Sequence, residues 1–221
     1  MKFKALVFVC VFTACCLQLS AQDARESLTS RLTEVFKKNP LPGFTAMVVD
    51  RKGVVFKKSF GYADITRKNS FTENTVENIG SVSKTFIAVA LMKAIELGYF
   101  NLETNINDIL PFKIANPFFP EEVITIRHLA THTSSIIDND SIYNRSYRFE
   151  KSVNTTETVL SFLKERGYTG GLKDTTLSTF LEQYFSRQGR LYTNANFFRS
   201  EPGRRSAYSN VGSALAAYLI E

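Results

Sequence analysis

One lysine within an apolar stretch constrains this chain more than any other feature. Lys84 is the only charged residue between Ile79 and Met92, and a lysine is almost never fully buried unless it is paired or used. The apolar residues around it recur with a spacing that predicts a helix buried on most sides. A helix places residues three apart on one face, so we expect Ser81 beside Lys84, with Ser83 pointing elsewhere. A hydroxyl beside a desolvated amine at a helix N-terminus is an arrangement that activates a serine nucleophile.

A second segment with chemical meaning is Tyr208-Ser209-Asn210. On its own it is a turn before a helix, which Asn210 is suited to cap. Beside a serine–lysine pair it has another interpretation. A phenol near an ammonium group becomes more acidic and can serve as a general acid or base, and an amide can orient a substrate carbonyl.

The two histidines of the chain lie four residues apart, at His128 and His132. This spacing invites a zinc interpretation, but Leu129 stands where a His-Glu-x-x-His metalloprotease needs its glutamate. We therefore expect no metal site, and histidines that cap and pack a short helix at residues 126–131. The shortage of histidine also argues against a Ser-His-Asp triad, as does the lack of a Gly-x-Ser-x-Gly elbow.

The first 21 residues have the features of a secretory signal peptide. Lys2 and Lys4 precede an apolar run at residues 5–19, and Ala21 ends a suitable cleavage site. All three cysteines lie in this leader, so we expect a secreted or periplasmic protein without disulfides or a thiol nucleophile. A loose lipobox ending at Cys15 is the competing interpretation, and only lipidation there would attach the protein to a membrane.

The rest of the chain, residues 22–221, is expected to form one domain with an α+β fold. The whole sequence, with 44% hydrophobic and 22% charged residues, is typical of a globular protein, and its basic residues form no nucleic-acid-binding pattern. Strands bracket a hairpin turn, and the remaining segments are mostly helical, without βαβ alternation. Helices are expected at 24–38, 126–131, 155–166 and 213–220, strands at 44–49 and 54–60, and a long loop at 191–209.

Taken together, three segments resemble the serine β-lactamase-related family, which holds class C β-lactamases, D-alanyl-D-alanine carboxypeptidases and related esterases. They are the serine–lysine pair, the stretch IRHLATHTSS at residues 126–135, and YSN at 208–210 behind Glu-Pro-Gly. The resemblance extends over residues 44–221. It implies a β-lactamase/transpeptidase-like fold, in which an antiparallel sheet is flanked by helices and accompanied by a helical subdomain.

The resemblance also implies roles for individual residues. Ser81 would be the acylated nucleophile, and its backbone N–H would be one oxyanion donor. Lys84 would accept or relay the serine proton, Tyr208 would act as general base, and Asn210 would contact the substrate amide. No metal or organic cofactor is implied. The substrate would be a small molecule or a peptidoglycan-derived peptide: a β-lactam, a D-Ala-D-Ala peptide, a short ester or another amide.

Two departures from the family pattern accompany the resemblance. Ser135 stands where relatives usually have the glycine of His-Thr-Ser-Gly, a change that the turn is expected to tolerate. The third motif, Lys or His before Thr/Ser-Gly, does not follow Tyr208 before Glu221. We therefore expect the C-terminal strands and final helix to be missing. The strands at 44–60 would then expose an unpaired edge and an apolar face.

These observations leave two functional hypotheses. The first is an exported serine hydrolase that forms an acyl-enzyme on Ser81 with an amide or ester. The second is a catalytically inactive, truncated remnant that keeps the cleft and binds peptidoglycan or a protein partner.

Overall fold

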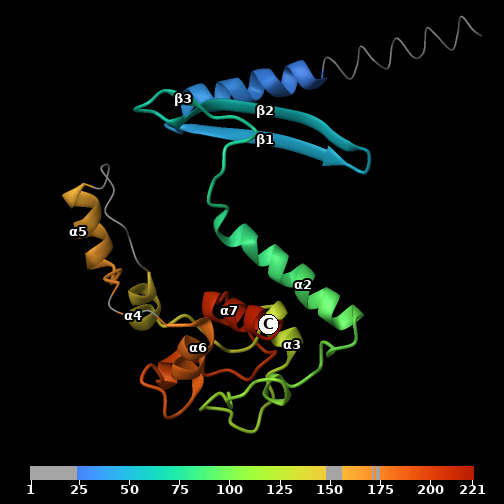
Figure 1. Cartoon of the computed structure of the whole chain (residues 1–221), viewed down its shortest axis with the longest axis vertical. Coiled ribbons are helices and arrows are strands. Elements are labelled where there is room, and N and C mark those ends of the chain that lie inside the picture. The colour runs from blue at the N-terminus through green and yellow to red at the C-terminus, as the bar shows by residue number, and fades with distance from the viewer. Residues whose placement is uncertain (1–23, 148–155, 171, 173–174) are drawn as a thin grey trace, which may run out of the picture. The chain divides into compact units, whose positions relative to one another are not determined.

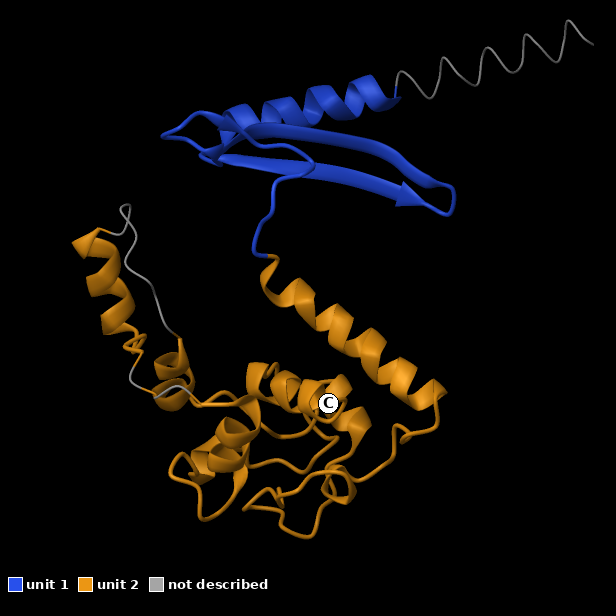
Figure 2. Cartoon of the chain, in the orientation of Figure 1, with its two compact units in different colours: residues 1–78 blue, residues 79–221 orange. Residues whose placement is uncertain are grey.

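A computed structural model describes residues 24–147, 156–170, 172 and 175–221. The signal peptide and both alternatives for its processing lie outside these residues and stay predictions, as do the limits of the domain at 22–221. The chain forms two compact units, residues 1–78 and residues 79–221 (Figure 2).

Unit 1 consists of a helix at residues 24–38 and three antiparallel strands in the order β1-β2-β3 (Figure 1). The strands are β1 (Gly43–Asp50), β2 (Gly53–Asp64) and β3 (Asn69–Ser70). The turn between β1 and β2 depends on Gly53, whose φ of +125° favours glycine. The predicted first helix and the predicted hairpin are both confirmed.

The helix of unit 1 packs on the sheet through aromatic rings. Phe36 lies with its ring centroid 6.0 Å from those of both Phe44 and Phe60, which stack on each other at 4.8 Å. Met47 and Val49 of β1 are 49% and 61% exposed. Among the described residues β1 pairs only with β2, so the expected unpaired edge and exposed apolar residues are present.

Unit 2 is helical and is organised around α7 (Asn210–Tyr218), which packs against α2, α3 and α6. Val211 and Leu215 of α7 are fully buried in the core that these helices form. The preceding elements are η1 (Gly80–Ser83), α2 (Lys84–Glu96), η2 (Ile106–Asp108), α3 (Ile126–Ala130), α4 (Asp140–Tyr143), η3 (Asn144–Ser146), α5 (Glu157–Glu165), α6 (Leu177–Phe185) and η4 (Asn194–Asn196). With the antiparallel strands of unit 1, they confirm the α+β class.

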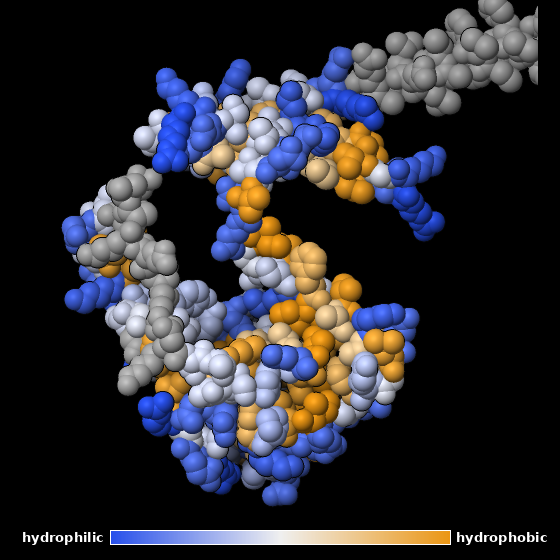
Figure 3. Space-filling model, in the orientation of Figure 1, coloured by the Kyte–Doolittle hydropathy of each residue, from blue (hydrophilic) through white to orange (hydrophobic). Residues whose placement is uncertain are grey.

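Within unit 2, helix α2 is buried on one side only, which differs from the predicted helix buried on most sides. Leu91 and Ala94 are buried on the side that faces α7. Phe86 and Val89 are each 69% exposed, and apolar surface follows the helix in Figure 3. Within unit 2, the described helix that packs extensively on α2 is α7, and one neighbour covers only one face of a helix.

The last helix begins earlier than predicted, at Asn210 instead of residue 213. The reason is Ser209, whose Oγ accepts a hydrogen bond from the Gly212 backbone N at 2.8 Å and so caps the helix. The predicted loop at 191–209 is interrupted only by η4, and α6 was not predicted at all. Of the helices in the described part of the chain, none has both the length and the apolar character required to cross a bilayer.

Candidate active site

The serine lies in the tight turn that leads into α2. Gly80 has a φ of +53°, a left-handed conformation that glycine adopts without strain, and it introduces the 3₁₀ turn η1. Ser81 belongs to this turn and Lys84 is the first residue of α2, so the two side chains face each other as the i,i+3 spacing predicts. Lys84 Nζ donates to Ser81 Oγ at 3.3 Å.

Tyr208 and Asn210 reach the same point from the start of α7. The hydroxyl oxygens of Ser81 and Tyr208 lie 2.6 Å apart. Lys84 Nζ also donates to Asn210 Oδ1 at 2.7 Å. The structure therefore brings together all four residues that the sequence singled out, although about half of the chain separates the two pairs.

The electrostatics of this group make the Tyr208 phenol more acidic than an ordinary tyrosine. Interaction with Lys84, and then the hydrogen bond with Ser81, lowers the pKa of Tyr208 below its ordinary value of 10.0. The ammonium nitrogen of Lys84 lies 5.0 Å from the Tyr208 ring centroid. The Tyr208 side chain is otherwise largely open to solvent, so a substrate can reach the hydroxyl pair. A serine between an ammonium group and an acidified phenol is equipped for nucleophilic attack.

His132 packs beside the ring of Tyr208, a role that the sequence did not assign to it. Its ring centroid lies 4.7 Å from that of Tyr208. Its Nδ1 accepts a hydrogen bond from the backbone N of Ser209 at 3.3 Å. Burial, and secondly the charge of Lys84, lowers the pKa of His132. The neutral ring thus packs beside Tyr208 and holds the chain segment that carries it.

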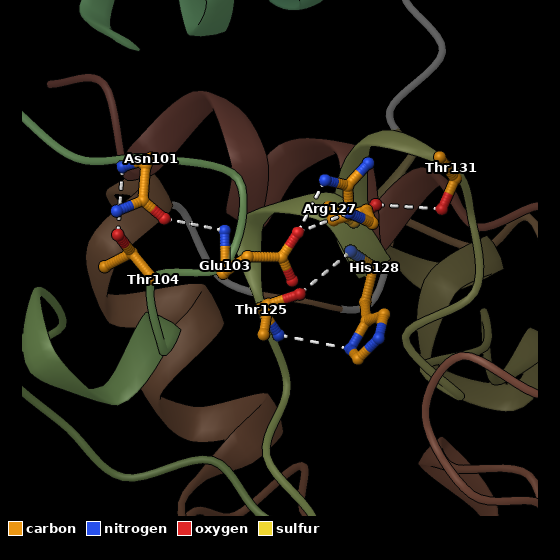
Figure 4. Close-up of polar contacts among 7 residues, drawn as sticks. All are labelled: Asn101, Glu103, Thr104, Thr125, Arg127, His128 and Thr131. Carbon is orange, nitrogen blue, oxygen red and sulfur yellow. Dashed lines mark hydrogen bonds and ion pairs between the residues drawn. The ribbon is translucent and has the colours of Figure 1, made fainter.

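His128 caps α3, in agreement with the structural role predicted for it (Figure 4). Its Nδ1 accepts from the backbone N of Thr125 at 3.2 Å, while Thr125 Oγ1 accepts from the backbone N of His128 at 3.4 Å. This reciprocal pair is a capping box, with a histidine where glutamate or glutamine is usual. In the described part of the chain, no three His, Cys, Asp or Glu residues are placed to hold a metal ion.

Asp138 is a residue of the site that the sequence did not reveal. Its carboxylate accepts from Ser209 Oγ at 2.9 Å, from the backbone N atoms of Asn210 and Val211 at 2.9 Å each, and from Asn210 Nδ2 at 2.7 Å. The acid therefore binds the start of α7 and the Asn210 side chain at once. No spacing rule marks it, because its partners lie more than 70 residues further along the chain.

The Beta-lactamase family model matches residues 28–221, which is most of the chain. The chain belongs to this family. It is 26% identical over 200 residues to penicillin-binding protein 4* of Bacillus subtilis (strain 168), a match that covers 90% of this chain and 36% of the relative. It is 31% identical over 133 residues to a β-lactamase of Escherichia coli (strain K12), with 60% and 34% covered. The chain thus spans about a third of the length of these relatives.

A solved structure shows the same fold as this member of the Beta-lactamase family. It is that of EstCE1, described as a hydrolase with promiscuous acyltransferase activity, with a TM-score of 0.61 and 23% identity. The likeness covers 89% of this chain and 48% of that one. The β-lactamase/transpeptidase-like fold that the sequence motifs implied is therefore confirmed.

Ser135, which stands where the family resemblance places a glycine, adopts a backbone conformation that favours glycine. Ser135 has a φ of +64°, in the left-handed region, and is almost fully buried. Its Oγ donates to the backbone O of Ser200 at 2.7 Å, and its own backbone O accepts from Phe198 N at 2.8 Å. These contacts hold the strained residue in place in the turn.

Proposed function

We propose that this protein is an exported serine hydrolase that forms an acyl-enzyme on Ser81 with an amide or ester substrate. The observation that carries the proposal is the position of Ser81 Oγ, 2.6 Å from the Tyr208 hydroxyl and 3.3 Å from Lys84 Nζ. Membership of a family of serine hydrolases supports the same reaction class.

The proposed reaction follows from these contacts. Ser81 Oγ attacks the carbonyl carbon of the substrate while its proton passes to the Tyr208 phenolate, directly or through Lys84. The protonated group then returns the proton to the leaving amine or alcohol as the carbonyl carbon–leaving group bond breaks, leaving the acyl group on Ser81. A water molecule, deprotonated by Tyr208, hydrolyses this ester and regenerates the serine.

The other residues of the group have binding roles in this proposal. Asn210 contacts the substrate amide, and the Ser81 backbone N–H donates to the oxyanion at the start of the helix. The proposed substrate is a small molecule or a peptidoglycan-derived peptide, which fits an enzyme that acts outside the cytoplasm. Each proton transfer is assigned to a side chain, so the proposed mechanism requires no metal or organic cofactor.

A fluorophosphonate probe, which phosphonylates activated serines, tests the assignment. Wild-type protein should gain the mass of one probe, and Ser81→Ala should gain none. The matched control is Ser83→Ala, because Ser83 is two residues away in the same turn and makes no capping hydrogen bond. The control should label like wild type. Labelling that persists in Ser81→Ala would contradict the proposal.

The same proteins distinguish the second hypothesis, a binding protein without catalysis. For that comparison, the wild type and Ser81→Ala are titrated with a purified muropeptide by calorimetry. If the wild-type protein binds the muropeptide saturably but is never labelled by the fluorophosphonate, the binding-protein hypothesis replaces the hydrolase assignment. Labelling at Ser81, together with hydrolysis of an activated ester that the fluorophosphonate inhibits, would exclude a binding protein without catalysis.

A further inference from the structure

We propose that Asp138 is a positioning residue that fixes the Asn210 side chain so that its carbonyl oxygen stays on Lys84. The inference rests on the proposed function, because it concerns the group that would activate Ser81. Its geometric basis is a chain of two hydrogen bonds. Asn210 Nδ2 donates to Asp138 Oδ2 at 2.7 Å, and Asn210 Oδ1 accepts from Lys84 Nζ at 2.7 Å.

The direction of the Asn210 amide is the critical point. An amide group has one acceptor oxygen and one donor nitrogen, so rotating it by half a turn exchanges them. In the rotated state, the Nδ2 group would face the Lys84 ammonium, and the oxygen would face the Asp138 carboxylate. Both contacts would then be repulsive, so Asp138 and Lys84 together permit only the observed orientation.

Asp138 can impose this orientation because it is itself held firmly. The residues on either side of it are fixed by one buried phenol: the Tyr184 hydroxyl donates to Ile137 O at 2.8 Å and accepts from Asn139 N at 2.9 Å. Tyr184 is fully buried, and burial raises its pKa, so it remains protonated and able to donate. The backbone that carries the carboxylate therefore has little freedom to move away from α7.

A purely structural role is the alternative explanation. Asp138 also accepts from the backbone N atoms of Asn210 and Val211, and an anion at a helix N-terminus stabilises the helix by itself. If this were its whole contribution, loss of Asp138 would weaken α7 without acting through the Asn210 side chain. The two explanations differ in what happens when Asn210 has already been removed.

The decisive experiment is a double-mutant cycle on the rate of fluorophosphonate labelling at Ser81. Asp138→Ala removes both carboxylate oxygens and should slow labelling by about tenfold to a hundredfold, the range expected for a hydrogen bond to a charged group. Asp140→Ala is the matched control, since Asp140 is an exposed acid two residues away. The control should label within about twofold of wild type, as expected for a surface change.

Adding Asp138→Ala to Asn210→Ala should then cause no further loss of labelling rate, because the side chain through which Asp138 acts is absent. The melting temperature should still fall, since the backbone contacts with α7 are lost in either background. Rate losses that multiply in the double variant would overturn the proposal in favour of a purely structural role. If Asp138→Ala does not fold, Asp138→Asn replaces it in the cycle. Its effect on the labelling rate should likewise be absent when Asn210 is already alanine.

A second measurement does not depend on activity. The side-chain amide resonance of Asn210, assigned by its absence in Asn210→Ala, should be shifted downfield by the carboxylate. It should move to the position of a free amide in Asp138→Ala and stay unchanged in Asp140→Ala. An unmoved resonance in Asp138→Ala would overturn the positioning role. A wild type that shows the shifted resonance but does not label would contradict the proposed function and leave the amide orientation upheld.

Discussion

Tyr208 and Ser81 place their hydroxyl oxygens 2.6 Å apart although 127 residues separate them in the sequence. The contact joins the turn before α2 to the segment that precedes α7, and the two helices pack directly against each other. The start of each helix is independently fixed, by Gly80 with its positive φ and by the Ser209 cap. The hydroxyl pair is thus set by the way two helices begin and by the core between them.

We predict that Tyr208→Phe slows labelling at Ser81 by about a hundredfold to ten-thousandfold, the usual contribution of a general base. The variant keeps the ring beside His132 and removes only the hydroxyl, so its melting temperature should change little. Tyr99→Phe removes an exposed phenol elsewhere in unit 2 and serves as the control. If Tyr208→Phe is labelled at Ser81 as fast as the wild type, the tyrosine has no part in the mechanism.

The pH dependence of Tyr208 gives a prediction about Lys84. Hydrogen bonding to Lys84, together with its positive charge, stabilises the phenolate, so Tyr208 should titrate below its ordinary pKa of 10.0. In Lys84→Met this cause is absent, and the titration should move to higher pH. The measurement is the phenolate absorbance of each protein minus that of the same protein carrying Tyr208→Phe. A Tyr208 titration that is identical with and without Lys84 would contradict the electrostatic account.

Local rules were sufficient for the features that depend on a few neighbouring residues. The i,i+3 spacing predicted the contact of Ser81 with Lys84, and glycine in a turn predicted the hairpin of unit 1. The end of α2 follows a local rule as well, since Gly98, with a φ of +81°, lies just beyond its last turn, where glycine is usual. The meeting of these residues with Tyr208 was different in kind, because only the family resemblance predicted it.

Features that depend on the tertiary environment were the ones that sequence reasoning missed. The apolar residues of α2 suggested burial on most sides, yet whether Phe86 is covered depends on which elements pack there. Asp138 belongs to no motif that was recognised, and it matters because its carboxylate accepts hydrogen bonds from the start of α7. Neither contact can be predicted from the spacing of residues in the sequence, since each joins segments that are distant along the chain.

Acid should destabilise the folded protein through its two histidines. Both His128 and His132 use Nδ1 to accept a backbone hydrogen bond, so each must be neutral at that nitrogen. Burial, the largest cause in both, lowers their pKa values below 6.5. The unfolded chain therefore binds protons first as the pH falls, and stability that is present above about pH 6.5 is lost below it.

Thermal melts between about pH 7.5 and about pH 5 measure this loss. His132→Asn offers a side-chain oxygen as a non-titrating acceptor near Nδ1, and it should lower the melting temperature at neutral pH but flatten its pH dependence. His128→Asn should flatten it in the same way. A wild-type melting temperature that rises on acidification over this range would show that the sign is wrong.

Ser135 provides a test of backbone strain. Its φ of +64° is unfavourable for any side chain with a Cβ, so glycine should be more stable than alanine at this position by about 1 kcal/mol. Both substitutions remove the hydrogen bond from Ser135 Oγ to Ser200 O, so the difference between them isolates the conformational effect.

Ser134→Gly and Ser134→Ala are the matched pair at the neighbouring buried serine, where φ is not positive. There, alanine should be the more stable of the two. Denaturant unfolding of all four variants measures these differences, and an alanine preference at position 135 equal to that at 134 would show that the turn carries no strain.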